Sequence, residues 1–184
     1  MYCTHIDIAG FTAWSSTREP AQVFLLLQAV YQAFDTLAKR RRVFKVETIG
    51  DSYVAVTGLP EPQANHASIM ARFAWECLIK MGEVTKELEV TLGPDTGDLG
   101  MRFGLHSGPV TAGVLKGDRA RFQLFGDTVN TGTFLRFCNV NCLLARSVHF
   151  VSHPLGKATE TYEHPLTSSI LWLSVPLCDD AALK

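Results

Sequence analysis

The sequence lacks an excess of charge of either sign. Its 184 residues include 17 Lys and Arg and 18 Asp and Glu, so the formal net charge is -1. A strongly basic surface is therefore not expected, and no nucleic-acid partner is predicted. Hydrophobic residues make up 47% of the chain and charged residues 19%, which excludes disorder over its whole length and predicts a globular chain.

Long apolar runs are missing as well. The longest candidate, Ile170 to Leu177, is interrupted by Ser174 and Pro176 and falls well short of the roughly 18–20 residues that span a bilayer. The first residues, MYCTHIDIAG, contain neither the basic region nor the apolar core of a secretory signal. These absences predict no membrane segment in this chain and a cytoplasmic location.

Cysteines are few and irregularly spaced. Their spacing suggests no disulfide framework, and the one close pair has no second pair or nearby His to complete a zinc site. We therefore expect reduced thiols at all five positions, which are Cys3, Cys77, Cys138, Cys142 and Cys178.

Clear strand and helix periods run through the first 131 positions. Strands are predicted at 2–8, 43–47, 52–57, 101–106, 110–115 and 120–125, and helices at about 16–42, at 63–89 and from 126 onward. The order β-α-β-β-α-β is typical of an α+β fold, a ferredoxin-like sheet covered by helices. The strands at 101–106 and 110–115 are expected to pair with each other around Ser107-Gly108-Pro109.

Acidic residues stand at two strand ends of this predicted sheet. Asp7 precedes the turn Gly10-Phe11-Thr12, whose backbone amides could face an anion, and Asp51 lies at the tip of a predicted hairpin. Both aspartates are expected on adjacent strands, at the same end of the sheet. Two convergent carboxylates suit Mg²⁺, with substrate phosphates completing its coordination. Glu47 is expected near the same site, on one strand face with Lys45.

Four segments, taken together, carry a family resemblance. In chain order they read DIAGFT, KVETIGDSY, RFGLHSGPVTAGV and FGDTVNT, and they cover the chain from about Tyr2 to Thr131. This set resembles the catalytic domain of the class III nucleotidyl cyclases, the adenylyl and guanylyl cyclases. The resemblance implies a reaction that joins the 3′-hydroxyl of a purine nucleoside triphosphate to its own α-phosphorus and releases pyrophosphate.

The resemblance also implies metal and phosphate sites. Two Mg²⁺ or Mn²⁺ ions are expected on Asp7, on Asp51 and on the backbone carbonyl of Ile8. The residues that match the phosphate loop of the family are Gly10, Phe11 and Thr12.

Two further matches concern the triphosphate and the ribose. Arg102 matches an arginine that reaches the triphosphate, and Asn130 matches an asparagine that positions the ribose. Family sites form between two subunits, so a homodimer, or a heterodimer with another cyclase domain, is expected. The chain is also expected to be part of a longer protein, such as the cytosolic domain of a membrane or sensor protein.

Substrate choice is expected to rest on two positions. Glu47 stands where guanylyl cyclases carry Glu and adenylyl cyclases usually carry Lys. A carboxylate accepts hydrogen bonds from guanine N1–H and the 2-amino group, whereas N1 of adenine is only an acceptor. Gln123, at the second position, has both donor and acceptor atoms and suits either base. The prediction is therefore GTP ahead of ATP.

One residue departs from the family pattern, and the match then stops. Phe134 stands four positions after Asn130, where the family carries an arginine that stabilises charge on the reacting phosphorus. We therefore predict an incomplete cyclase catalytic domain at 1–131 and a divergent tail without a predicted fold at 132–184. A frameshift, a retained intron or a recent truncation would explain such an abrupt break, and comparing the transcript with the genomic frame at codon 132 tests this.

Other functions stay open at this point. Phe134 favours a catalytically dead cyclase-homology module that acts as a dimerisation or regulatory partner, whereas Asp7, Asp51 and Asn130 favour an enzyme. A diguanylate cyclase requires a GG-acidic-EF hairpin, and this chain has Ile49-Gly50-Asp51-Ser52-Tyr53 instead. A ferredoxin-like RNA binder requires exposed sheet aromatics and a basic face, which the net charge disfavours.

Overall fold

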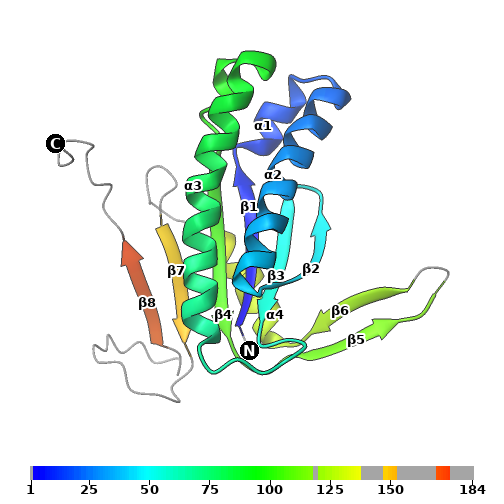
Figure 1. Ribbon diagram of the computed structural model, residues 1–184, viewed down its shortest axis with the longest axis vertical. Coiled ribbons are helices and arrows are strands. Elements are labelled where there is room, and N and C mark those ends of the chain that lie inside the picture. Colours follow the sequence, from blue (N-terminus) through cyan, green and yellow to red (C-terminus); the bar gives the residue numbers. More distant parts are fainter. Residues whose placement is uncertain (1, 118–119, 138–146, 153–168, 175–184) are drawn as a thin grey trace.

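The computed structural model describes residues 2–117, 120–137, 147–152 and 169–174 (Figure 1). Its main element is a six-stranded sheet in the order β2-β3-β1-β4-β7-β8. The strands are β1 (Tyr2–Ala9), β2 (Phe44–Ile49), β3 (Ser52–Thr57), β4 (Gly100–Ser107), β7 (Ser147–Ser152) and β8 (Ser169–Ser174). All neighbours are antiparallel except β4 and β7. The first four strands have the ferredoxin-like order, which confirms the predicted fold class.

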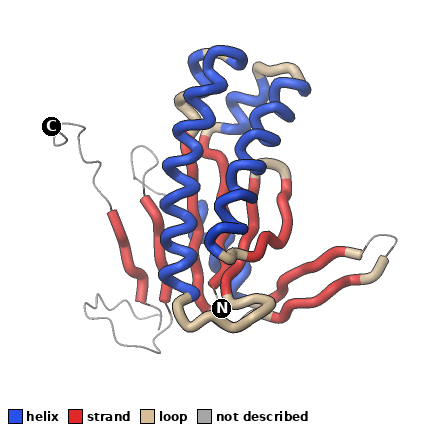
Figure 2. Tube along the Cα trace, in the orientation of Figure 1, coloured by secondary structure: helices blue, strands red, loops and turns tan. Residues whose placement is uncertain are grey.

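Two long helices, α2 (Pro20–Arg41) and α3 (His66–Leu92), lie side by side on one face of the sheet (Figures 1 and 2). Pro20 occupies the first turn of α2, and a capping box between Glu19 and Gln22 satisfies backbone groups at that end. Arg41 and, to a lesser extent, Arg40 of α2 pair with Glu76 of α3 and lower the pKa of that carboxyl to about 2.

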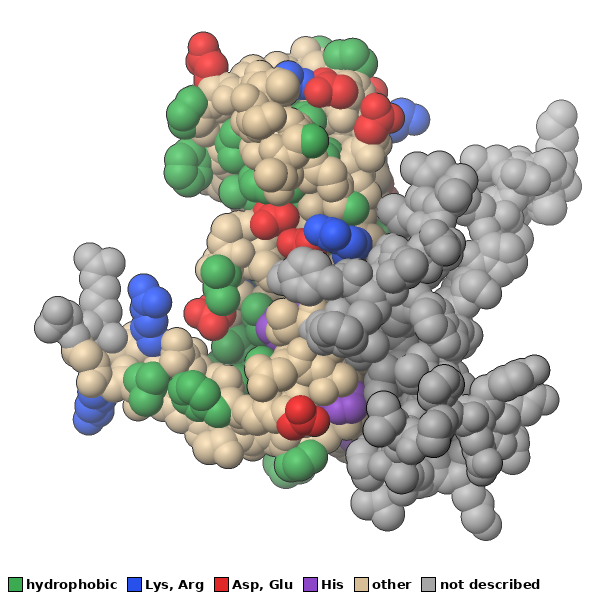
Figure 3. All heavy atoms as spheres, turned by 180° about the vertical axis from the view of Figure 1, so that it is seen from behind, with side chains coloured by type: hydrophobic (Ala, Val, Ile, Leu, Met, Phe, Trp, Pro, Cys, Tyr) green, Lys and Arg blue, Asp and Glu red, His purple; other side chains and the backbone are tan. Residues whose placement is uncertain are grey.

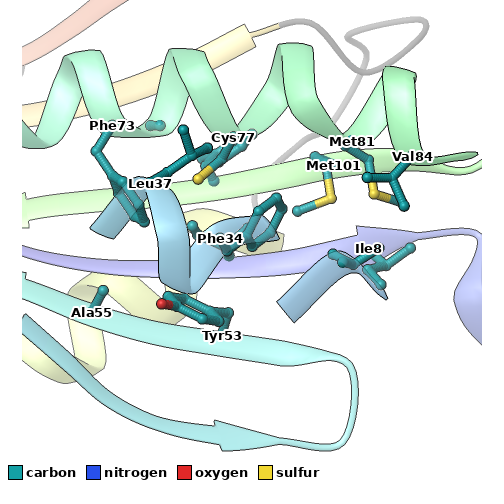
Figure 4. Close-up of a cluster of buried hydrophobic side chains, with 14 of the residues drawn as sticks. Ile8, Phe34, Leu37, Tyr53, Ala55, Phe73, Cys77, Met81, Val84 and Met101 are labelled. Atoms are coloured by element: carbon teal, nitrogen blue, oxygen red, sulfur yellow. The ribbon is translucent and has the colours of Figure 1, made fainter. Parts of the chain in front are cut away.

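The main core fills the space between these helices and the sheet (Figure 4). Tyr53 and Ala55 of β3 point into it, and so do Ile8 of β1, Phe34 of α2 and Phe73 of α3; all five are at most 1% exposed. Because side chains alternate along a strand, the residues between these positions face the other side of the sheet. That other side carries the site described below.

A short helix, α1 (Phe11–Ser16), follows β1, where the sequence predicted only a turn. It starts at Gly10, whose φ of +84° is the left-handed conformation that glycine adopts without strain. A single 3₁₀ turn, η1 (Pro94–Thr96), connects α3 to β4. The indole N–H of Trp14 donates to the Thr96 hydroxyl at 3.3 Å and so joins α1 to η1.

The face away from the long helices is covered in part by α4 (Asp127–Phe137), which packs against β1 and β4. Val129 of α4 contacts a second, smaller apolar cluster around Val54 and Val56 of β3. The predicted boundary between residues 131 and 132 falls inside α4, and it stays a prediction. No described helix is long and apolar enough to cross a membrane.

The strands β5 (Thr111–Leu115) and β6 (Arg121–Phe125) form a separate hairpin, which we call the arm (Figure 1). The predicted pairing of 101–106 with 110–115 is therefore wrong, because β4 pairs with β1 and β7, and β5 pairs with β6. Within the arm, Val114 lies opposite Phe122, an apolar cross-strand pair that favours this hairpin. At its base, the Thr128 hydroxyl donates to the carbonyl of Pro109 at 2.7 Å and joins the arm to α4.

Candidate functional site

A cleft of about 340 Å³ opens on the α4 side of the sheet. It brings together four of the residues singled out from the sequence: Asp7, Thr12, Asp51 and Arg102. The rest of its lining comes from β1, the β2–β3 hairpin and α4, and consists of His5, Ile49, Ser52, Val54 and Thr133. Figure 3 shows this side of the molecule, with acidic and basic side chains next to each other above the arm.

Strand register explains why these residues meet. Asp7 lies opposite Ser52 of β3 on one side and opposite Arg102 of β4 on the other. Paired residues point to the same face, so Asp7, Ser52 and Arg102 converge on the cleft. Since Asp51 immediately precedes Ser52, the two aspartates lie on adjacent strands at one end of the sheet, as the sequence predicted.

Charge compensation is already present at Asp7. This residue is only 5% exposed, and the Arg102 guanidinium forms an ion pair with its carboxylate. A buried carboxylate is costly unless it is paired and hydrogen-bonded, so the ion pair with Arg102 offsets part of the cost of burying Asp7. The pair also places a cationic group inside the cleft, where an anionic ligand would meet it.

Asp51 sits in the tight turn between β2 and β3. Gly50 has a φ of +59° and Asp51 a negative φ, and Ile49 pairs with Ser52 across the turn. A two-residue loop with glycine in the first position has the pattern of a type II′ turn, which suits the twist of a hairpin. The Tyr31 hydroxyl of α2 donates to the Gly50 carbonyl at 2.6 Å.

Asp7 and Asp51 both affect the pKa of Tyr31. Burial raises the pKa of Tyr31, and the negative charges of Asp51 and Asp7 raise it further. Two carboxylates that line one cleft fit a hard divalent cation whose remaining ligands are substrate oxygens. Within the described residues no group of three or more His, Cys, Asp or Glu forms a metal site.

The residues in and next to the predicted phosphate loop differ in their exposure and in whether they line the cleft. The Ile8 side chain is 1% exposed and packs in the core, so only its backbone could serve a ligand. Gly10 is exposed, and Phe11 stacks against Trp14 with ring centroids 6.3 Å apart. Only Thr12 of this loop lines the cleft.

Glu47 and Lys45 do not share a strand face, contrary to the sequence prediction. Lys45 pairs with Ala55 and Glu47 pairs with Val54, because a β-bulge shifts the register between them. Ala55 belongs to the core under α2 and α3, whereas Val54 lines the cleft. The extra residue thus turns Glu47 from the helix side to the cleft side of the sheet. Glu47 itself is half-buried and is not part of the cleft lining.

Gln123 and Asn130 lie outside the cleft lining. On β6, Phe122 packs edge-on against Phe44 with centroids 5.1 Å apart, and Leu124 contacts the cluster around Val54. Alternation along the strand turns Gln123 to the opposite face of the arm. Asn130 is exposed on α4. Neither residue therefore contributes to the cleft that Asp7 and Asp51 line in the same copy.

The sequence reasoning missed His5 and Thr133 as cleft residues. The Thr133 hydroxyl lies 3.2 Å from Nε2 of His5, which is 7% exposed beneath α4. His5 was within reach of prediction, because it precedes Asp7 by two residues on a strand and so shares its face. Thr133 depends on how α4 packs, which a local pattern does not encode. Phe134 lies on α4 four residues after Asn130, and its side chain is outside the described part.

Comparison with known proteins matches residues 3–138 to the adenylate and guanylate cyclase catalytic domain. Receptor-type guanylate cyclase gcy-28 of Caenorhabditis elegans is 44% identical over 127 residues, which are 69% of this chain and 10% of that protein. Human guanylate cyclase soluble subunit beta-2 is 42% identical over 128 residues, which are 69% of this chain and 20% of that protein. The chain thus spans a fifth or less of the length of these two relatives.

Solved structures give a similar result. The guanylate cyclase domain of RhGC from Catenaria anguillulae, in complex with GTP, is 37% identical with a TM-score of 0.66, over 81% of this chain and 76% of that one. A dimeric guanylyl cyclase domain of the RhoGC fusion protein from the fungus Blastocladiella emersonii is 35% identical with a TM-score of 0.68, over 82% and 78%. The guanylyl cyclase Cya2, at 18% identity and a TM-score of 0.76, supports the fold alone.

Proposed function

The chain belongs to the adenylate and guanylate cyclase catalytic domain family, and from that membership we propose that it forms a 3′,5′-cyclic nucleotide and pyrophosphate, from GTP ahead of ATP. The observation that carries the proposal is the convergence of Asp7 and Asp51 on one cleft that also contains Arg102. The predicted cytoplasmic location goes with this proposal.

Asp7 and Asp51, with the backbone carbonyl of Ile8, are the proposed ligands of two Mg²⁺ or Mn²⁺ ions. When bound, the ions would lower the pKa of the attacking 3′-hydroxyl and neutralise charge on the triphosphate. Arg102 already balances the charge of Asp7 and is proposed to bind the triphosphate. Backbone amides around Gly10, Phe11 and Thr12 would add donors to the phosphate oxygens, which Thr12 in the cleft lining supports.

A second subunit is part of the proposal. Gln123 for the base and Asn130 for the ribose lie outside the cleft lining of their own copy, on the arm and at an exposed position of α4. The arm carries apolar side chains that are about half exposed, namely Val114, Leu115 and Phe125 (Figure 3). A homodimer, or a heterodimer with another cyclase domain, would cover this surface and bring one copy's Asn130 to the other's aspartates.

The preference for GTP rests on Glu47. The bulge in β2 turns this carboxylate toward the cleft side of the sheet, beside Val54. There it could accept hydrogen bonds from guanine N1–H and the 2-amino group, which adenine does not offer. Gln123 can donate to guanine O6 or accept from the adenine amine, so it adds no preference of its own.

The central experiment incubates the purified chain with Mn²⁺ and either GTP or ATP and measures the cyclic nucleotide. We expect product from GTP and none from the Asp51→Ala variant at the same protein concentration. Both proteins are checked by circular dichroism and by sedimentation. Absence of product from a folded dimer of the unaltered chain, with either nucleotide, would contradict the proposed activity.

Phe134 favours one alternative, a catalytically inactive module that pairs with another cyclase domain. The residue stands where the family carries an arginine that stabilises charge on the reacting phosphorus. Restoring it by Phe134→Arg separates the two functions. A rise in rate indicates an enzyme weakened at this position. Activity that appears only when a complete cyclase domain is added indicates the pairing module.

A further inference from the structure

We propose that Tyr31, on α2, is a positioning residue that sets the orientation of Asp51 through the Gly50 carbonyl and thereby tunes metal binding. The inference rests on the proposed function, because it assumes that Asp51 is a metal ligand. Tyr31 itself lies outside the cleft lining and would touch neither metal nor nucleotide.

The contact between α2 and the turn is a short hydrogen bond. The Tyr31 hydroxyl donates to the Gly50 carbonyl oxygen at 2.6 Å, across 19 positions of sequence. A Cβ added at Gly50 would meet nothing within 4 Å, and Ile49 before it is 60% exposed. The hydroxyl is therefore a specific anchor on a part of the hairpin outside the core.

Anchoring the Gly50 carbonyl constrains the peptide group that leads into Asp51. The Gly50 carbonyl and the Asp51 N–H belong to one planar peptide group, so holding the oxygen also fixes the nitrogen. Type II′ and type I′ turns, the two common two-residue hairpin loops, differ by the direction of this central peptide. Releasing the carbonyl would let the peptide rotate and would re-aim the Asp51 side chain.

Contacts behind the ring hold Tyr31 in place. Its ring centroid lies 5.9 Å from that of Tyr53 and 5.9 Å from Nζ of Lys45. Lys45 in turn pairs with Asp35 at 2.8 Å, and the Tyr53 hydroxyl donates to the same carboxylate at 2.8 Å.

The test compares Tyr31→Phe with Tyr53→Phe. Each variant loses one hydroxyl from the same pair of packed rings, but only Tyr31 bonds the turn, whereas Tyr53 bonds Asp35. Mn²⁺ binding is measured from the electron paramagnetic resonance signal of the free ion. The chain is saturated with 3′-deoxy-GTP, which lacks the attacking hydroxyl. Melting temperatures and the KM for GTP at saturating Mn²⁺ are measured in parallel.

We expect Tyr31→Phe to weaken Mn²⁺ binding by about 2- to 10-fold, the range set by one lost hydrogen bond. The KM for GTP at saturating metal should stay within a factor of two or so of the unaltered chain, since no nucleotide contact is removed. Tyr53→Phe should lower the melting temperature and leave Mn²⁺ binding unchanged. Equal Mn²⁺ binding in Tyr31→Phe and the unaltered chain overturns the inference, and so does an equal loss in both variants.

A third variant separates the failure of this inference from failure of the proposed function. Asp51→Asn keeps the shape of the side chain and removes its charge. If it abolishes Mn²⁺ binding while Tyr31→Phe changes nothing, Asp51 is a ligand and the positioning role is wrong. If Asp51→Asn binds Mn²⁺ as well as the unaltered chain does, Asp51 is not a ligand, and the proposed metal site fails together with the inference.

Discussion

The cleft and the arm are built in opposite ways. In the cleft, Asp7 is 5% exposed, its charge is paired with Arg102, and strand register on both sides fixes its position. In the arm, every residue of β5 is exposed, and apolar side chains such as Val114 and Leu115 are more than half exposed. The position of Asp7 in the cleft is thus fixed within one copy, whereas the arm presents apolar surface that one copy leaves exposed.

This difference shows which part of the proposed site one copy can form without a partner. The two proposed metal ligands come from elements hydrogen-bonded into one sheet, so they require no partner for their placement. The proposed base and ribose groups, Gln123 on the arm and Asn130 on α4, are not part of the lining of that cleft. A site divided in this way would be active only when two copies meet, which makes activity depend on concentration.

The largest effect on activity is expected from a substitution in the cleft alone. Asp7→Asn removes a charge and leaves the volume unchanged, and loss of a metal ligand should lower the rate by about 1,000-fold or more, measured as cyclic nucleotide from GTP and Mn²⁺. Asp98→Asn, the same change on an exposed loop residue, should leave the rate unchanged. Comparable rates in the two variants, both dimeric and folded, would show that Asp7 is not a metal ligand.

The next experiment combines two variants, each of which lacks a different half of the proposed two-copy site. Asp7→Asn and Asn130→Ala are expected to be inactive alone. In a symmetric dimer, a mixed pair keeps one intact site, so equal mixing should restore about a quarter of the normal rate. Restoration should require time for the subunits to exchange. If the mixture stays as inactive as either variant, while exchange is shown by a labelled subunit, both residues act in the same site of one copy.

A third change concerns the base-reading positions. Glu47→Lys with Gln123→Asp should shift the ratio of kcat/KM values for GTP and ATP toward ATP by about 100-fold, because the altered groups reverse the hydrogen-bonding pattern. Both nucleotides are measured at saturating Mn²⁺. Lys45→Met is the control, since Lys45 faces α2 on the other side of the bulge and should not alter the ratio. A shift in the control rather than in the double variant would contradict the assignment.

Local patterns predicted the cleft side well. Period-2 alternation and the turn at Gly50 placed Asp7 and Asp51 on adjacent strands, because hairpin geometry is encoded within a few residues. The bulge between Lys45 and Glu47 was missed, since one extra residue leaves no clear mark on the apolar pattern. The helix at 11–16 was missed as well, because its six residues are too few to show a period.

The arm was the less predictable half. Met101–His106 and Val110–Leu115 are consecutive apolar runs around a glycine and a proline, which locally look like one hairpin. The competing pairings of β4 with β1 and of β5 with β6 are decided by the whole sheet. No fold was predicted for the tail at 132–184, whereas the structure has β7 and β8 within it. Long-range pairing of this kind lies outside what local periods encode.

The smallest expected effect concerns how firmly the arm is held. Phe122→Leu removes the edge-on ring contact with Phe44 and should weaken arm docking by about 0.5–1.5 kcal/mol. In hydrogen exchange at low protein concentration, β6 amides should then exchange about 2- to 10-fold faster, while β1 and β4 amides are unaffected. Phe125→Leu, at an exposed position of the same strand, is the control and should change neither. Faster exchange across β1 and β4 as well would mean that the arm and the cleft unfold as one cooperative unit. That result would contradict the structural division between cleft and arm on which the proposed two-copy site rests.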